Sequence, residues 1–263
     1  MYSLKDLFSV LDRLSPIEYS YKMIEGGDYD NSGILVDCKT PVKKVLFSLD
    51  LSFEAVKRAK KNGCDTIVTH HPAIYSPIKS LSEDSAISGQ VLQCAKYGIN
   101  VVSMHLNLDV ANGGIDQTLS EVLGGDNAKV LEFVVDGIGY GREFNVKEQT
   151  LKEYFNLVKN AFSTDKAVVY GKKSEKVSLV ASFCGGGSSH AEKYVLGGGK
   201  ADVIVTSDMP HHVIKELIEN DKKIILLPHY CAEEVGFKAY FERATKELSG
   251  VVETCYFDDK RFR

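Results

Sequence analysis

The segment Asp-Thr-Ile-Val-Thr-His-His-Pro, residues 65–72, decides how this chain should fold. Its first five residues are rich in β-branched side chains, which predicts a short strand buried on both faces, as in sheets covered by helices. Two histidines follow at once, and Pro72 holds His71 extended and marks the exit from the strand. Because adjacent strand residues point to opposite faces, both imidazoles can serve one site only at such an exit. Two unrelated loop histidines remain the alternative interpretation.

Outward from this segment, short apolar runs alternate with helical patterns, which predicts an α/β protein. Ser52 is a plausible N-cap for one helix, and Gly63 stands where a C-terminal glycine belongs. The predicted strands are residues 44–49, 65–69, 100–104, 167–170, 177–183, 201–206, 223–227 and 250–256. The predicted helices are 1–14, 53–62, 86–97, 116–123, 147–162, 190–196, 211–219 and 232–248.

Composition and charge argue against a nucleic-acid-binding protein and against a membrane protein. The 263 residues carry a net charge of −4, and 44% are hydrophobic, so the chain lacks the basic footprint of a nucleic-acid binder. No run approaches the roughly 18 apolar residues that a membrane span needs. Charges interrupt the N-terminal helix, unlike a signal peptide. We therefore expect a cytoplasmic protein with no membrane partner, in which the six cysteines are mostly small buried hydrophobes and form no disulfide framework.

Two further clusters of candidate ligands follow predicted strands. His105 and Asp109 come directly after the strand at 100–104, and His229 and Glu233 come after the strand at 223–227. Loops at the carboxyl ends of buried strands are where α/β proteins bind ligands, and an i, i+4 pair on a helical turn faces one direction. Each residue also has a structural interpretation: a buried histidine, a turn-forming or capping aspartate, or a glutamate placed in a first turn by the helix dipole.

Together these clusters offer more nitrogen and oxygen donors than one tetrahedral zinc needs. They suit two ions about 3.5–4 Å apart, bridged by a carboxylate and a water. Imidazole and carboxylate fit zinc, iron, manganese, nickel or cobalt, and spacing does not choose among these metals. The candidate metal ligands are His70, His71, Asp109, His229 and Glu233, with His105 as a sixth candidate.

Two other segments border this predicted site. The glycine-rich residues 184–189 follow a strand and precede a helix, so their amides could cradle a phosphate, although a plain tight turn is an equal alternative. Residues 206–212 also close an apolar strand. Their His212 could contact substrate or ligands, or the segment could be a helix start capped by Asp208.

Five segments in series resemble the Nif-three-like family, whose members are often labelled GTP cyclohydrolase type 2 homologues. They span most of the chain: Asp30-Asn31-Ser32-Gly33, Thr69-His70-His71-Pro72, His105-Leu106-Asn107-Leu108-Asp109 with Gly113-Gly114, Thr206-Ser207-Asp208 with His212, and His229-Tyr230-Cys231-Ala232-Glu233. Ser207 and Gly185-Gly186-Gly187 depart from the family pattern, which usually has Thr-Gly-Asp and Gly-Ser-Gly there, and these departures weaken any transfer of substrate binding.

The resemblance implies that the same five predicted ligands bind the metals, with Glu233 as the bridging carboxylate. It also implies two interlinked α/β domains flanking a dimetal cleft, and a ring-shaped homohexamer. Glycine and asparagine cluster near residue 125, and His229 must return to the strands that carry His70. We therefore expect a discontinuous metal-binding domain, 1–125 plus 228–263, and a second α/β domain at 126–227.

The resulting functional hypothesis is a metal-dependent hydrolase that acts on a nucleotide or a related small molecule. The metals would activate water, and His105 or His212 would shuttle protons. The alternative is a non-catalytic metal- or ligand-binding or regulatory protein. A ring that binds nucleic acid is disfavoured by the acidic charge balance. Lys79 and Lys215 are the lysines nearest in sequence that could favour an anionic substrate.

Overall fold

The chain is a mixed α/β protein, as its pattern predicts, and the computed structural model describes all 263 residues. It divides into two compact units, residues 1–111 with 237–261 and residues 112–236 with 262–263. We predicted the boundaries after residues 125 and 227, and the structure places them after Ala111 and Gly236. A Cβ on Gly236 would lie 2.6 Å from the Ile115 Cα, and this close packing keeps both segments within the second unit.

The first unit is built on a five-stranded sheet in the order β1-β4-β3-β2-β11. β1 runs antiparallel to β4, and the other neighbours are parallel. The central strands are buried along their whole length, which explains their continuous apolar sequences. The strands are β1 (Gly33–Val36), β2 (Lys44–Ser48), β3 (Thr66–Thr69), β4 (Asn100–Ser103) and β11 (Glu253–Tyr256).

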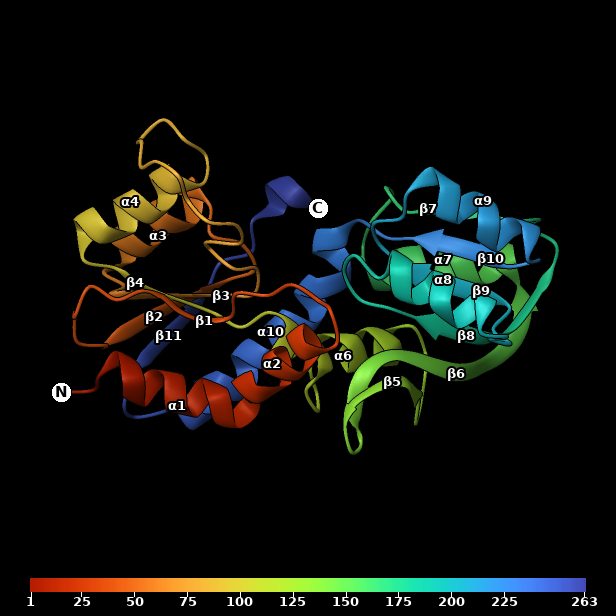
Figure 1. Cartoon of the computed structure of the whole chain (residues 1–263), viewed down its shortest axis with the longest axis horizontal. Coiled ribbons are helices and arrows are strands. Elements are labelled where there is room, and N and C mark those ends of the chain that lie inside the picture. The colour runs from red at the N-terminus through yellow and green to blue at the C-terminus, as the bar shows by residue number, and fades with distance from the viewer. The chain divides into compact units, whose positions relative to one another are not determined.

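Helices cover both faces of this sheet. Figure 1 shows α3 and α4 on one face and α1 on the other. Side chains alternate accordingly along β2: Leu46 packs in the core beneath α3 and α4, whereas the Phe47 ring lies 6.3 Å from that of Phe237 on α10. The helices of this unit are α1 (Leu4–Leu14), α2 (Ile17–Glu25), α3 (Phe53–Asn62), α4 (Ser88–Tyr97), α5 (Leu106–Val110) and the later turns of α10 (His229–Glu247), and the 3₁₀ turn η1 is Lys260–Phe262.

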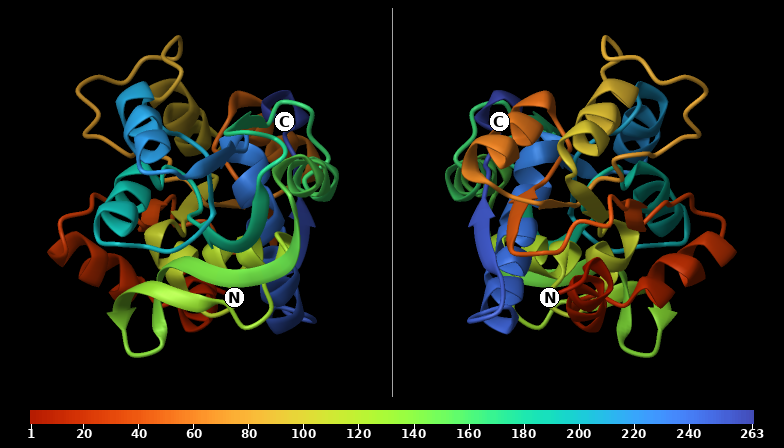
Figure 2. Two further views of the ribbon diagram at one scale, coloured as in Figure 1. Left: turned by 90° about the vertical axis from the view of Figure 1, so that its right-hand side faces the viewer. Right: turned by 90° about the vertical axis from the view of Figure 1, so that its left-hand side faces the viewer.

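The second unit contains a six-stranded sheet in the order β5-β6-β8-β9-β10-β7. β8, β9 and β10 are parallel, and β5, β6 and β7 pair antiparallel with their neighbours. The left view of Figure 2 shows α8 and α9 on one side of this sheet and α7 on the other. The elements are α6 (Ile115–Val122), β5 (Lys129–Val135), β6 (Ile138–Thr150), α7 (Leu151–Ala161), β7 (Val168–Tyr170), β8 (Lys176–Ser182), α8 (Ser188–Leu196), β9 (Val203–Thr206), α9 (His211–Glu219) and β10 (Lys223–Leu226).

Capping residues explain why both ends of α3 were predicted correctly. The Ser52 hydroxyl accepts a hydrogen bond from the Ala55 amide at 3.1 Å, and Gly63 takes the left-handed conformation with φ 68°. Both roles were predicted, and α3 has the predicted bounds. None of the helices combines the length and the apolar composition that crossing a membrane requires.

The prediction of a helix from residue 147 was wrong, because residues 147–150 are the end of β6. Thr150 and Glu153 form a capping box that starts α7 at Leu151. The sequence analysis also missed β1, α2, α5 and the β5–β6 hairpin. Asp136-Gly137 forms the turn of that hairpin, with Gly137 at φ 74°, and this dipeptide is the hairpin signal that could have revealed it.

Candidate metal centre

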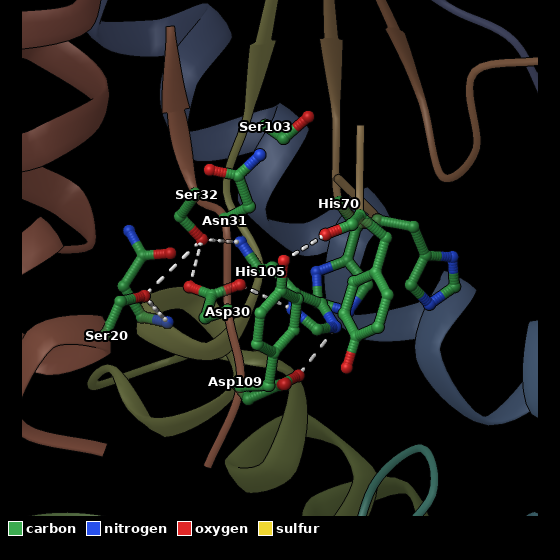
Figure 3. A network of polar contacts seen from close by, with 12 residues as sticks. Ser20, Asp30, Asn31, Ser32, His70, Ser103, His105 and Asp109 are labelled. Carbon is green, nitrogen blue, oxygen red and sulfur yellow. Dashed lines mark hydrogen bonds and ion pairs between the residues drawn. The ribbon is translucent and has the colours of Figure 1, made fainter. Parts of the chain in front are cut away.

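The carboxyl ends of β3 and β4 bring three histidines together within the first unit. The two strands are parallel, with Thr69 opposite Ser103, so the residues that follow leave the sheet at the same edge. His70, His71 and His105 each offer a ring nitrogen, and these atoms all lie within 4.8 Å of one another. Figure 3 shows His70 and His105 at this edge of the sheet. Histidine and acidic groups so arranged could bind a metal ion.

His70 is held by a backbone carbonyl. Its Nδ1 lies 2.9 Å from the Met104 carbonyl oxygen, and because that oxygen can only accept, the proton belongs on Nδ1. The Nε2 atom then carries the lone pair that a metal would use, and it lies 3.5 Å from Oδ1 of Asp109 on α5. His70 and Asp109 are both buried, so this edge holds an imidazole and a carboxylate next to each other.

The other two histidines are held by carboxylates in the same way. His71 Nδ1 lies 2.7 Å from Asp50 Oδ1, and His105 Nδ1 lies 2.8 Å from Asp30 Oδ1. All three rings therefore have Nδ1 on a carbonyl or carboxylate oxygen. Such contacts set the tautomer and the ring orientation before any metal binds.

Asp30 is itself fixed by a small polar network, drawn in Figure 3. The Ser32 hydroxyl donates to Asp30 Oδ2 at 2.6 Å and accepts from the His105 amide at 3.0 Å. Burial opposes ionisation of Asp30, but hydrogen bonds from His105, Ser20 and Ser32 outweigh it and lower the pKa to about 2. Asp30 is therefore a carboxylate at neutral pH, ready to accept the His105 proton.

The second unit contains its own imidazole–carboxylate pair in the first turn of α10. His229 Nε2 lies 3.0 Å from Glu233 Oε2, as the i, i+4 spacing predicts. His229 Nδ1 lies 2.6 Å from Asp208 Oδ2, so this ring also has Nδ1 on an oxygen. The alternative in which Asp208 caps α9 is wrong, because Pro210 occupies the N-cap position with no side-chain cap.

The glycine-rich loop before α8 packs against this pair. Gly185 has φ +56°, and a Cβ there would lie 2.4 Å from Glu233 Oε1 and 3.6 Å from His229 Cε1. Only glycine allows both that backbone conformation and that approach. The loop at residues 184–189 is therefore a cradle for the Glu233 carboxylate and more than a plain tight turn. His212, by contrast, is exposed in the first turn of α9.

Sequence reasoning missed the residues that orient the imidazoles. Asp50 was not singled out, Asp30 entered only as part of a motif, and Asp208 was given a capping role. The available signal was position: Asp50 comes two residues after β2, the strand that neighbours β3. A carboxylate at the end of an adjacent parallel strand is well placed to reach a histidine on the next one.

The donor chemistry fits divalent metal ions. Every candidate ligand is an imidazole or a carboxylate, and each imidazole presents Nε2 because its Nδ1 is engaged. Such donors suit zinc, iron or manganese better than soft copper(I) or an iron–sulfur cluster. Each unit therefore contains a preorganised group of side chains that could bind metal.

The chain is similar to known proteins both in its sequence and in its fold. A GTP cyclohydrolase 1 type 2 homolog from Clostridium perfringens is 28% identical over 95% of this chain and 94% of its own length. The NIF3-like protein 1 of Drosophila melanogaster is 26% identical over 86% of this chain and 76% of its own. A crystal structure of a Bacillus cereus protein related to NIF3 has the same fold, with a TM-score of 0.87, 21% identity and coverage of 97% and 96%.

A family model matches almost the whole chain. The model for Duf34/NIF3 (NGG1p interacting factor 3) aligns with residues 2–261. That range includes every histidine and carboxylate described above. This chain belongs to the Duf34/NIF3 family.

Proposed function

We propose that this protein is a metal-dependent hydrolase that acts on a nucleotide or a related small molecule. One observation carries the proposal: the imidazoles of His70, His71 and His105 converge at one sheet edge, with ring nitrogens within 4.8 Å of one another and each Nδ1 held by an oxygen. Preorganised imidazoles of this kind are a costly arrangement that a purely structural role does not require. The proposed ligands of two divalent ions are His70, His71, Asp109, His229 and Glu233.

The two carboxylates of this proposed ligand set have different roles. Glu233 is the proposed bridge, because a carboxylate has two oxygens and can ligate two ions at once. The Gly185 backbone lies so close to that carboxylate that a Cβ there would be 2.4 Å from Glu233 Oε1. Asp109 is the proposed terminal ligand.

The protein's own side chains have defined tasks in such a hydrolase. Bound divalent ions would supply Lewis acidity and lower the pKa of a water toward 7. His105 is the proposed proton shuttle, because its Nδ1 proton is bound to ionised Asp30 while Nε2 can accept and release a proton. His212 is a second candidate, although its exposed position offers less support.

A cavity next to His71 supports a small-molecule substrate. It has a volume of about 470 Å³ and lies within the first unit, a size that suits a substrate of nucleotide dimensions. Its lining combines the apolar Ile78 and Ile87 with Tyr75 and the basic residue Lys79. Such a lining fits a ligand with an aromatic or apolar body and an anionic end. Lys79, which sequence alone could not position, thus becomes the proposed contact for the anionic group.

Metal content is the first test of this proposal. Wild-type protein should bind about two divalent ions per chain, as expected for a two-metal site, and Glu233→Ala should lose most of that metal while keeping its fold. Elemental analysis measures the metal, and circular dichroism checks the fold. Glu219→Ala, on α9, is the matched control and should keep full metal content. Unchanged metal in Glu233→Ala would refute the ligand assignment.

Turnover is the second test, and GTP is the first substrate to try because relatives carry the name GTP cyclohydrolase 1 type 2 homolog. Other nucleotides and simple phosphoesters follow. In an active protein, Lys79→Ala should raise KM with a smaller effect on kcat, and Lys61→Ala, an exposed lysine on α3, should change neither. Metal-loaded protein that hydrolyses none of these substrates would favour the alternative, a non-catalytic metal- or ligand-binding or regulatory protein.

A further inference from the structure

Two cysteines far apart in sequence meet in the first unit, away from the histidine cluster. The Sγ atoms of Cys64 and Cys255 lie 3.6 Å apart and are separated by 191 residues along the chain. Cys64 follows α3, where its amide donates to the Ala59 carbonyl at 2.9 Å, and Cys255 lies on β11, paired with Leu46 of β2. Both backbones are therefore anchored, and the sulfur contact does not depend on a loose loop.

We propose that Cys64 and Cys255 form a reversible redox site, a dithiol that small-molecule disulfides oxidise to an intramolecular disulfide. The geometry carries this inference. The two sulfurs are in contact before any reaction, so only a small adjustment separates them from bonding distance. The proposal is independent of the function proposed for the histidine cluster.

The surroundings of the pair favour a nucleophilic thiolate on one member. A hydrogen bond from the Cys64 thiol lowers the pKa of Cys255 to about 7; burial opposes this, and Lys44, Asn62 and Arg58 act in the same direction as Cys64. The pKa of Cys64 is raised, first by its hydrogen bond to Cys255 and then by burial. Cys255 is therefore the attacking group, and Cys64, which is more deeply buried, is the resolving thiol.

Two other cysteines of the same unit, Cys38 and Cys94, provide an internal contrast, with the Cys38 sulfur 4.0 Å from the Cys94 carbonyl oxygen. The Cys38 thiol donates to the Ile99 carbonyl at 3.4 Å, an arrangement that favours the protonated form. Burial raises the pKa of Cys38, and it raises that of Cys94 to about 12. Cys38 is half-buried like Cys255, so exposure alone does not distinguish them. The thiols of Cys38 and Cys94 should remain reduced under conditions that oxidise the first pair.

The proposed reaction balances with a small-molecule disulfide as the oxidant. The Cys255 thiolate attacks one sulfur of that disulfide, forming a mixed disulfide and expelling one thiolate. Cys64 then gives up its proton, attacks Cys255 Sγ and expels the second thiolate. The two leaving thiolates take up the protons that the cysteines lose. In total the protein dithiol loses two electrons and two protons, and the oxidant becomes two thiols.

The test exposes the full-length protein to oxidised glutathione and follows it by mass spectrometry. Wild type should lose two hydrogens, and peptide mapping should link the segment with Cys64 to the segment with Cys255. Cys64→Ser should instead accumulate a mixed disulfide on Cys255, because the resolving thiol is gone. Cys255→Ser should leave Cys64 reduced. A Cys38→Ser, Cys94→Ser double variant should behave as wild type.

A second measurement, the rate of cysteine alkylation as a function of pH, uses the wild-type protein and does not depend on whether the Cys64 and Cys255 variants fold. In the wild-type protein, the pH dependence of alkylation should give a midpoint near 7 for Cys255 and a midpoint above the ordinary value of about 8.5 for Cys38. Equal reactivity of these two cysteines, or a wild-type protein that stops at the mixed disulfide, would overturn the proposal. Where Cys64→Ala folds, its Cys255 midpoint should rise toward the ordinary value, because the thiol donor is lost.

Discussion

At the scale of single residues, the candidate centre depends on which nitrogen of each histidine is already engaged. His70, His71 and His229 all use Nδ1 on a carbonyl or carboxylate oxygen. In His70 and His229 the other nitrogen, Nε2, lies next to a carboxylate oxygen, of Asp109 and Glu233 respectively. An imidazole fixed in this way loses little side-chain entropy when it binds a metal, which favours binding.

Gly185 provides the sharpest prediction at this scale. In Gly185→Ala the new methyl would overlap Glu233 Oε1, at 2.4 Å, and the residue would be strained at φ +56°. Displacing the carboxylate should weaken metal binding by about 10- to 100-fold, the usual effect of disturbing groups around ligands. Gly186→Ala is the matched control, since a Cβ there meets nothing within 4 Å. Calorimetric titration with metal compares them, and equal affinities would contradict the cradle.

At the scale of elements, a buried ion pair fastens α6 to the second sheet. Asp116 on α6 and Arg142 on β6 approach to 2.9 Å, and the Cys184 amide donates to the same carboxylate at 3.2 Å. Burial raises the pKa of Asp116 to about 6, although Arg142 and the backbone amides oppose this. The pair holds the helix in place only while both partners are present.

Removing Arg142 should therefore lower the free energy of unfolding. Arg142→Met leaves the Asp116 carboxylate buried without its counter-ion, and the free energy of unfolding at pH 7 should fall by about 3–5 kcal/mol. Burial raises the folded-state pKa of Asp116 to about 6 even with Arg142 present, and losing Arg142 should raise it further, so the variant should be most stable at low pH and lose stability as the pH rises through that higher pKa. Urea unfolding at pH 5 and pH 7 measures both effects.

The control for this prediction is an exposed ion pair between two strands of the same sheet. Lys176 and Glu148 lie 3.7 Å apart with side chains more than 60% exposed. Lys176→Met should change the free energy of unfolding by less than about 1 kcal/mol, because water already screens this pair. Comparable losses in the two variants would mean that burial does not set the strength of the Arg142 contact.

At the scale of the whole molecule, the resemblance to the Nif-three-like family implies a ring-shaped homohexamer, and this remains a prediction. The chain has a mass of 29.0 kDa, so light scattering at micromolar concentration should give six times that mass. A hexamer that dissociates should do so without unfolding either unit, since each has its own sheet and core. A monomeric mass at that concentration would refute the assembly.

Sequence alone determined the parts of this protein that depend on local chemistry. The buried strands, the bounds of α3 and α9, and the clusters of candidate ligands at strand ends all followed from apolar runs, caps and turns. Those signals are short-range, because burial on both faces and capping geometry leave their mark within a few residues. The Asp136-Gly137 hairpin belongs with them, since its signal was present although it was missed.

Only the tertiary structure decided which distant residues act on one another. Asp30 reaches His105 across 75 residues, and Cys64 meets Cys255 across 191. Neither contact has a local signature, because strand order and register are set by packing across the whole sheet. The ends of the units after Ala111 and Gly236 depend on the same long-range packing, and no pattern in the neighbouring sequence could have located them.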